Sequence, residues 1–336
     1  MCMFFMWFEY FMKSLDSKRL HDLTGKIFIW ATAKLPNFLL YLVDRIVLFK
    51  KKIVGVPDMP KDLCVNIEWI KELNIDYHSF GEKKKLWISW IMRIKNWDDF
   101  MEAVIESHLQ LCDEIVIVDN QSTDQTPAIA QKMLKKYPDR IQYYEYNYDV
   151  IKCFTKEFEE CPGNSIHALA YFVNFAYSKA RYMYVMKVDD DDLWIPSFAQ
   201  KLRKKILTMK PNRAFYYFWI NLLKIGNVMG ICKYSPYLGK NWDHLIYPMS
   251  KKTYCLQSYW SELFVQPRRW YRFRLWCLHL KYLKREYGCI NYPEPKKTQR
   301  IKTILDGWID TDFKKYDKKL TKNIIYDTLH HFWIKI

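Results

Sequence analysis

Residues 182–194 read YMYVMKVDDDDLW. The run from Tyr182 to Met186 is aromatic and β-branched, which is typical of a buried strand, so the four aspartates lie where that strand reaches the surface. Four adjacent carboxylates repel one another and oppose folding unless a cation neutralises them. The stretch therefore predicts a strand of a central sheet with a cation site at its end.

An alternation of strands and helices precedes this stretch. We expect strands at 86–92, 114–118 and 141–146, and helices at about 98–111, 126–137 and 167–180. Strands separated by helices of this length imply a mostly parallel sheet with right-handed crossovers. Ligands of such sheets bind beyond the carboxyl ends of the strands. The loop DNQSTDQT (119–126) and the aspartates (189–192) are therefore expected at one site.

The order of these two features, EIVIVDNQSTDQT (114–126) followed by YVMKVDDDDLW (184–194), resembles the GT-A glycosyltransferases, and among them the large inverting family 2. The segment MRIKNWDDFMEAVIESHL (92–109) looks like the opening of that family, although Trp97 stands where members often carry Glu. The resemblance covers roughly residues 86–200. It implies an α/β fold of the GT-A type, with a Rossmann-like, mostly parallel sheet flanked by helices. We expect an N-terminal helical extension and a C-terminal basic helical region around it.

The resemblance also implies roles for the acidic residues. Asp119 would hydrogen-bond the base or ribose of a nucleotide-sugar, and we expect Asn120 and Asp124 of the same loop in the donor site. Asp189 and Asp191 would form the D-x-D that binds Mn²⁺ or Mg²⁺ at the donor diphosphate. Oxygen-bound divalent cations stabilise the charge that develops on such a leaving group. Because four acids leave the register open, Asp190 stays a candidate for the donor and Asp192 for the metal.

An inverting transferase also needs a base that takes the proton of the acceptor hydroxyl. Asp243 in GKNWDHLIYP and Glu262 in YWSELF are the two candidates. We prefer Asp243 because it lies in an expected loop, where His244 can adjust its protonation and Trp242 offers a stacking face to a sugar. A turn or helix-cap role is the alternative for Asp243.

Basic residues close to the expected site are candidates for contact with the anionic donor. Arg93 and Lys95 follow the first strand, and His167 begins the helix before the acidic strand. A solvated pair and a capped or exposed histidine are the ordinary alternatives. His279 in LHLKYLKR faces either the acceptor, a lipid phosphate or the protein interior.

Composition limits the class of protein. The chain of 336 residues is 50% hydrophobic and carries a formal charge of +16, so its field attracts anions. Its 9 cysteines include no C-x-x-C pair. An odd count without such pairs argues against a disulfide framework or a structural zinc site and suits a reducing compartment.

The flanks of the expected catalytic domain are apolar or basic. The opening MCMFFMWFEYFM fits neither a signal peptide nor a spanning helix, and charges interrupt the apolar run at 27–52. That run suits either an amphipathic helix on a membrane surface or a helix packed on the next domain. Residues 267–285 interleave Arg and Lys with aromatic residues, as a basic amphipathic helix or a nucleic-acid surface would. We divide the chain into an extension (1–84), a nucleotide-sugar-binding and catalytic domain (85–250) and a C-terminal basic region for acceptor or membrane contact (251–336).

The leading hypothesis is a metal-dependent hexosyltransferase that moves a sugar from a nucleotide-sugar, with a UDP-sugar as the first choice, to a glycan or lipid-linked acceptor in surface polysaccharide or lipopolysaccharide synthesis. The basic charge fits a cytoplasmic enzyme that lies peripherally at an anionic membrane. One alternative is a nucleic-acid-binding protein that uses the C-terminal region, which leaves the four acids unexplained. Another is a nucleotidyltransferase on the same fold, which releases pyrophosphate instead of a nucleoside diphosphate.

Overall fold

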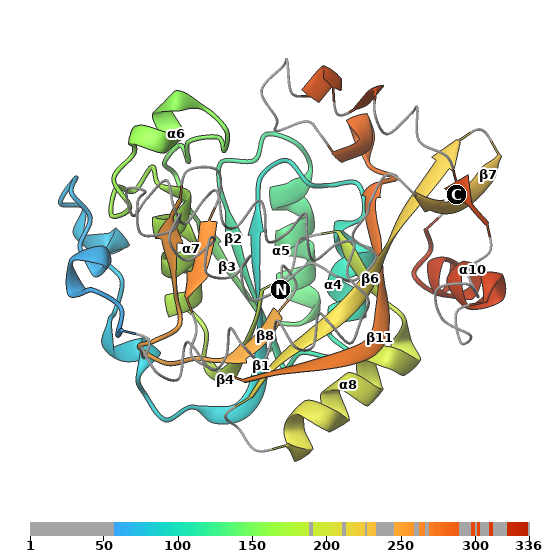
Figure 1. Cartoon of the computed structure of the whole chain (residues 1–336), viewed down its shortest axis with the longest axis horizontal. Helices are drawn as coiled ribbons and strands as arrows, with labels where there is room; N and C mark the ends of the chain where they lie inside the picture. Colours follow the sequence, from blue (N-terminus) through green and yellow to red (C-terminus); the bar gives the residue numbers. More distant parts are fainter. Residues whose placement is uncertain are drawn as a thin grey trace, which may run out of the picture.

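The computed structural model describes residues 57–187, 191–209, 213–225, 227–232, 245–258, 262–265, 269–288, 297–299, 301–302, 309–311 and 321–334. Within these ranges a ten-stranded sheet runs in the order β12-β7-β6-β8-β4-β1-β2-β3, with β11 paired to β6 and β5. A two-stranded sheet, β10-β9, lies beside it. The arrangement is a mixed α/β fold with helices on both faces of the sheet (Figure 1).

The strands and helices alternate along the first half of the described chain. The strands are β1 (Lys85–Ile94), β2 (Glu114–Asp119), β3 (Ile141–Glu145), β4 (Tyr182–Lys187), β5 (Asp192–Trp194), β6 (Arg213–Ile225), β7 (Val228–Cys232), β8 (Leu245–Pro248), β9 (Tyr254–Gln257), β10 (Glu262–Val265), β11 (Arg269–Tyr282) and β12 (Ile309–Asp310). The α-helices include α4 (Met101–His108), α5 (Thr126–Lys136), α6 (Lys156–Glu160), α7 (Leu169–Ser178), α8 (Pro196–Thr208) and α10 (Lys322–His331). Short 3-10 helices are η1 (Lys61–Cys64), η2 (Lys71–Leu73), η3 (His78–Phe80) and η4 (Arg285–Gly288).

The centre of the sheet is parallel. β1 pairs with β2 on one side and with β4 on the other, and β2 pairs with β3, all in parallel register. β8 and β6 extend this unit by antiparallel pairing, and β11 then adds to β6 in parallel. The parallel centre follows from the helices α4, α5 and α7, whose length allows the chain to cross back to the start of the next strand.

Two apolar cores cover the two faces of the sheet. Successive side chains of a strand point to opposite faces, so Trp90 packs in one core while Ile91 packs in the other. The first core includes buried residues of α4, α5 and α8. The second is built around α7, in which eight of the ten residues are buried, together with the segment from Met59 to Phe80. In Figure 1, α6 and α7 lie to the left, and α8 and α10 lie toward the right.

Most of the expected elements occur close to their predicted positions. The strands expected at 86–92, 114–118 and 141–146 correspond to β1, β2 and β3, and β4 ends immediately before the acidic run. The helices expected at 98–111, 126–137 and 167–180 correspond to α4, α5 and α7, with shorter bounds.

The prediction of a basic amphipathic helix within 267–285 is wrong. Residues 269–282 form β11, the longest strand of the sheet, which pairs with β6 over most of its length. Long-range pairing overrides the local pattern here, because a strand between β6 and β5 satisfies its backbone hydrogen bonds on both sides. The domain boundaries at 84 and 250 stay predictions, and the run at 27–52 lies outside the described residues.

No helix in the described ranges combines the length and the apolar composition needed to cross a lipid bilayer.

Candidate active site

The carboxyl ends of β1, β2 and β4 meet at one edge of the sheet. In β1, Ile91 lies opposite Lys187 of β4, and Ile94 lies opposite Asp119 of β2. Because neighbouring strands are about 4.8 Å apart, the ends of β2 and β4 are about 10 Å apart across β1. The loop after β2 therefore begins close to the end of β4, which the acidic run follows in the sequence.

Asp119 closes a turn at the end of β2. Its carboxylate accepts hydrogen bonds from the Ser122 amide (3.1 Å), the Ser122 hydroxyl (2.6 Å) and the Tyr143 hydroxyl (3.1 Å). Burial and the Asp119 charge raise the pKa of Tyr143, so its hydroxyl stays a donor to this carboxylate. The side chain of Asp119 is 3% exposed, which keeps its position fixed at the sheet edge.

The loops after β1 and β2 are joined by side-chain hydrogen bonds. Asn96 donates its backbone amide to the Ser122 hydroxyl (2.8 Å) and accepts from the Thr123 amide (2.7 Å). The Trp97 amide donates to the Thr126 hydroxyl at 2.6 Å. Asn96 and Gln121 both adopt positive φ, at 56° each, a left-handed conformation that is uncommon outside glycine. The two loops are thus one ordered unit.

Two further residues of the predicted donor loop hold this unit together. The Asn120 amide group donates to the backbone oxygens of Tyr146 (3.1 Å) and Tyr148 (2.6 Å). Asp124 accepts from the Thr126 amide (2.9 Å) at the start of α5. Both side chains shape the donor loop by these contacts, and their predicted contact with a donor stays a prediction.

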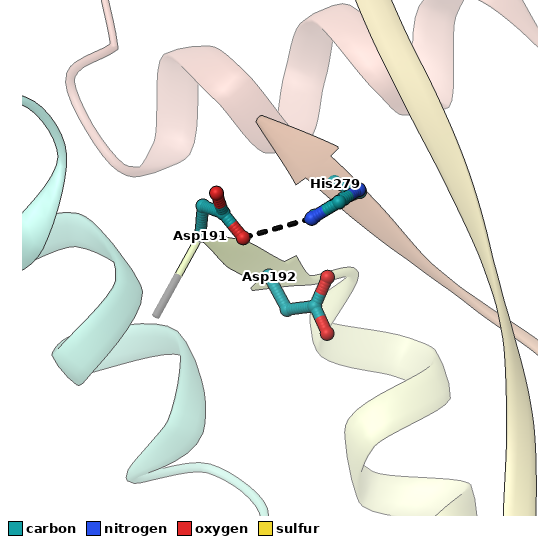
Figure 2. Close-up of side chains that lie close together, drawn as sticks. All are labelled: Asp191, Asp192 and His279. Atoms are coloured by element: carbon teal, nitrogen blue, oxygen red, sulfur yellow. Dashed lines mark ion pairs between the residues drawn. The ribbon is translucent and has the colours of Figure 1, made fainter. Parts of the chain in front are cut away.

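Three side chains form a group with the donor atoms of a metal site. The ligand atoms of Asp191, Asp192 and His279 all lie within 4.8 Å of one another, and all three residues are buried. His279 Nε2 lies 2.8 Å from Asp191 Oδ1 (Figure 2). The group forms because β11 pairs antiparallel with β5, which puts His279 directly opposite Asp192. Burial raises the pKa of the Cys277 thiol on the same strand, and the Asp192 charge adds to this effect.

Asn221 of β6 fixes the orientation of the His279 ring. The Asn221 side-chain oxygen contacts His279 Nδ1. Nε2 is then the atom turned toward Asp191. A backing hydrogen bond of this kind is how proteins orient metal-binding histidines.

A segment after β11 connects the acidic residues to the two loops. Lys284 Nζ lies 3.1 Å from Asp191 Oδ2 and 4.7 Å from the Trp97 ring centre. Arg285 pairs with Asp98, with Asp99 (3.1 Å) and with Asp124 (3.6 Å). These contacts show that Asp191, the loop after β1 and the loop after β2 surround one region.

Arg93, a predicted donor contact, and Glu262, a predicted base, lie next to each other. Their charged atoms are 3.7 Å apart, and Lys187 lies 3.8 Å from the same Glu262 oxygen. All three side chains are less than one-fifth exposed. Glu262 therefore faces two cations of the chain.

Lys95 and His167 both contact Asp149, but at different atoms. Lys95 Nζ is 3.6 Å from the Asp149 carboxylate, and His167 Nδ1 is 2.6 Å from the Asp149 backbone oxygen. The predicted contacts of Lys95 and His167 with a donor stay predictions. Asp189, Asp190 and Asp243 lie outside the described residues, so their predicted roles stay predictions.

Asn221, His279 and Lys284 are the site residues that sequence reasoning missed or left unassigned. His279 was considered for contact with the acceptor or a lipid phosphate, but it lies beside the acidic run. No local pattern identifies these residues, because pairing among β5, β6 and β11 brings them together.

Comparisons with known proteins fall on the same part of the chain. The family model described as Glycosyl transferase family 2 matches residues 89–152, from within β1 to beyond β3. No curated protein matches the chain. A crystal structure of S. aureus TarS is 14% identical to it, and the alignment covers 73% of this chain and 48% of that chain with a TM-score of 0.30. The chain thus spans about half the length of that structure.

A second crystal structure, S. aureus TarS 1-349 in complex with UDP, is also 14% identical. Its alignment covers 74% of this chain and 75% of that chain with a TM-score of 0.31. Likeness at this level says nothing by itself about what this chain binds. The family 2 match is more specific, because it contains β1, β2, β3 and the two joined loops. The resemblance to family 2 glycosyltransferases is thereby confirmed for this segment.

Proposed function

We propose that the protein is a metal-dependent, inverting glycosyltransferase that takes a sugar from a nucleotide-sugar, with a UDP-sugar as the first choice. The observation that carries the proposal is the Asp191–Asp192–His279 group beside β4, at the sheet edge where Asp119 ends β2. A buried group of two carboxylates and an oriented imidazole suits a divalent cation. The family 2 match over the neighbouring strands supports the same reaction class.

The donor atoms fit Mn²⁺ in particular. Carboxylate oxygens suit Mg²⁺ and Mn²⁺ alike, whereas an imidazole nitrogen suits the transition metals. Asp191, Asp192 and His279 would hold the ion, and Asp189 is proposed to join them. When bound, the ion neutralises the negative charge that develops on the departing diphosphate.

The chain's own residues are proposed to complete the reaction. Asp119 orients the nucleoside by accepting a hydrogen bond, from a position that Ser122 and Tyr143 hold fixed. A carboxylate on the acceptor side takes the proton of the attacking hydroxyl, which becomes the new glycosidic oxygen. We keep Asp243 as the preferred base, because Glu262 is engaged by Arg93 and Lys187.

The proposed acceptor is a glycan or a lipid-linked sugar of surface polysaccharide or lipopolysaccharide type. The formal charge of +16 supports peripheral attachment to an anionic membrane from the cytoplasmic side. Sedimentation with vesicles that contain anionic lipid, compared with neutral vesicles, tests the attachment. Equal recovery in the two pellets would contradict it.

Calorimetry of UDP binding, with and without Mn²⁺, tests the donor site. We expect micromolar binding that requires Mn²⁺ in the parent protein and is lost in Asp191→Ala. Asp327→Ala, on an exposed face of α10, is the matched control and should bind as the parent does. If no nucleoside diphosphate binds with metal dependence, the proposal fails. If the protein instead releases pyrophosphate from a nucleoside triphosphate when a sugar phosphate is supplied, the activity is nucleotidyl transfer.

A further inference from the structure

Asp191, which the proposed function gives to the metal, already contacts a histidine and a lysine of the chain. One carboxylate oxygen faces His279 at 2.8 Å, and the other faces Lys284 at 3.1 Å. The Asp191 and Lys284 side chains are 5% and 11% exposed. The pair is therefore well shielded from water, and it is stronger than a surface ion pair.

The backbone around Lys284 is anchored, whereas its side chain is long and flexible. Arg285, the next residue, is held by three carboxylates of the loops after β1 and β2. The Lys284 amide donates to the Lys281 oxygen at 3.3 Å. A lysine has a flexible four-carbon stem that ends in a compact charge. Its ammonium can thus exchange one anionic partner for another without movement of the segment.

A divalent cation bound at Asp191 weakens the pairing between Asp191 and Lys284. The cation and the ammonium repel each other, so the ammonium loses its favourable position at the carboxylate. A nucleoside diphosphate brings more negative charge than one divalent cation neutralises. The Lys284 ammonium can then pair with the diphosphate in the same region of the site.

We propose that Lys284 is a binding residue for the donor diphosphate, which pairs with Asp191 in the empty site and with the diphosphate in the loaded one. The inference rests on the proposed function, because it takes Asp191 as a metal ligand. The alternative is a purely structural lysine that keeps Asp191 in place. The two roles predict opposite effects on metal affinity.

Lys284→Met tests the difference, because methionine keeps an unbranched apolar stem next to Trp97 and removes the charge. Mn²⁺ affinity without nucleotide is measured by electron paramagnetic resonance, and UDP affinity at saturating Mn²⁺ by calorimetry. We expect Mn²⁺ to bind as tightly as in the parent or up to about tenfold more tightly, because a competing cation is gone. UDP should bind at least about tenfold more weakly, because a charged hydrogen bond is lost.

Lys132→Met is the matched control. It removes a lysine charge from an exposed ion pair between Lys132 of α5 and Glu102 of α4. Lys284→Arg keeps the positive charge and should recover part of the UDP affinity. Circular dichroism establishes that each variant is folded, and Lys284→Gln replaces Lys284→Met if the methionine variant is not.

Two results for Lys284→Met overturn the inference, and a third result concerns the metal site alone. Weaker Mn²⁺ binding in Lys284→Met assigns the lysine a structural role, and unchanged UDP affinity removes it from the donor site. A parent protein that binds no Mn²⁺ refutes the metal site and leaves the proposed role testable. In that case metal-free UDP binding decides, and it must weaken in Lys284→Met for a diphosphate contact to hold.

Discussion

Among single residues, Glu114 lies fully buried at the start of β2 with several donors on its carboxylate. Ser89 donates its hydroxyl at 2.6 Å and Arg181 its amide at 3.0 Å, and the Arg181 side chain forms an ion pair with it. Removal of one partner of a buried pair leaves the others unsatisfied and costs about 3 to 5 kcal/mol. Because Arg181 is 48% exposed, we expect Glu114→Ala to lower the free energy of unfolding by about 3 kcal/mol. Urea denaturation measures this loss.

The control for Glu114→Ala is Glu102→Ala. Glu102 and Lys132 form a pair whose side chains are 44% and 63% exposed, so its loss should cost less than about 1 kcal/mol. Equal losses in the two variants would mean that water reaches Glu114 in the native protein.

Asp119 offers a test of charge at the donor loop with little change of shape. In Asp119→Asn the remaining oxygen can still accept from Ser122, while the negative charge is lost. A hydrogen bond to a charged group is worth about 1.5 to 3 kcal/mol. We therefore expect UDP to bind at least about tenfold more weakly. If the nucleotide affinity is unchanged, Asp119 serves the loop alone.

At the scale of elements, one of the hydrogen bonds that join the loops after β1 and β2 is buried. The Trp97 amide donates to the hydroxyl of Thr126, the first residue of α5, and Thr126 is fully buried. Thr126→Val keeps the shape and leaves this amide without its acceptor, which costs about 1 to 3 kcal/mol. We expect that loss in urea denaturation. Thr208→Val, at the exposed end of α8, is the matched control and should change stability by less than about 0.5 kcal/mol.

The elements that the sequence predicted well are those decided by local pattern. β1, β2 and β4 are short apolar runs, and α5 and α7 fill the intervals between strands, so length and composition suffice. β11 was missed because its Arg, Lys and aromatic residues also suit a helix at a membrane. Its strand conformation is decided by β6, more than forty residues earlier in the chain. A local sequence pattern does not predict the pairing of strands so far apart in the chain.

At the scale of the whole molecule, one part of the candidate site comes from elements that local pattern predicts. The other part comes from strands whose pairing is long-range. Asp119 and Asp191 come from the ends of parallel strands, and the rule for such sheets brings them together. His279 and Asn221 come from β11 and β6, whose pairing places them at the acidic run. The Asp191–Asp192–His279 group therefore depends partly on the predicted parallel unit and partly on the strands added to it.

Cysteine reactivity tests the packing of this composite molecule. Cys112, Cys255 and Cys277 are at most 1% exposed, on widely separated elements, and burial raises the pKa of each thiol. Burial also raises the pKa of Cys64 to about 11. The thiolate is the reactive form, so a raised pKa slows alkylation at pH 8. Among the six cysteines whose surroundings the structure describes, Cys153 is partly exposed, and we expect it to react first.

Iodoacetamide labelling followed by peptide mass spectrometry gives the order of reaction. We expect Cys153 before Cys161, whose pKa is also raised by burial, and both well before the four buried thiols. In urea these differences should disappear, because every thiol then meets water. Cys277 is the informative position, since its protection requires β11 to lie in the sheet beside β5. If Cys277 reacts as fast as Cys153 in the native protein, β11 does not pack as described, and His279 is not held at Asp191.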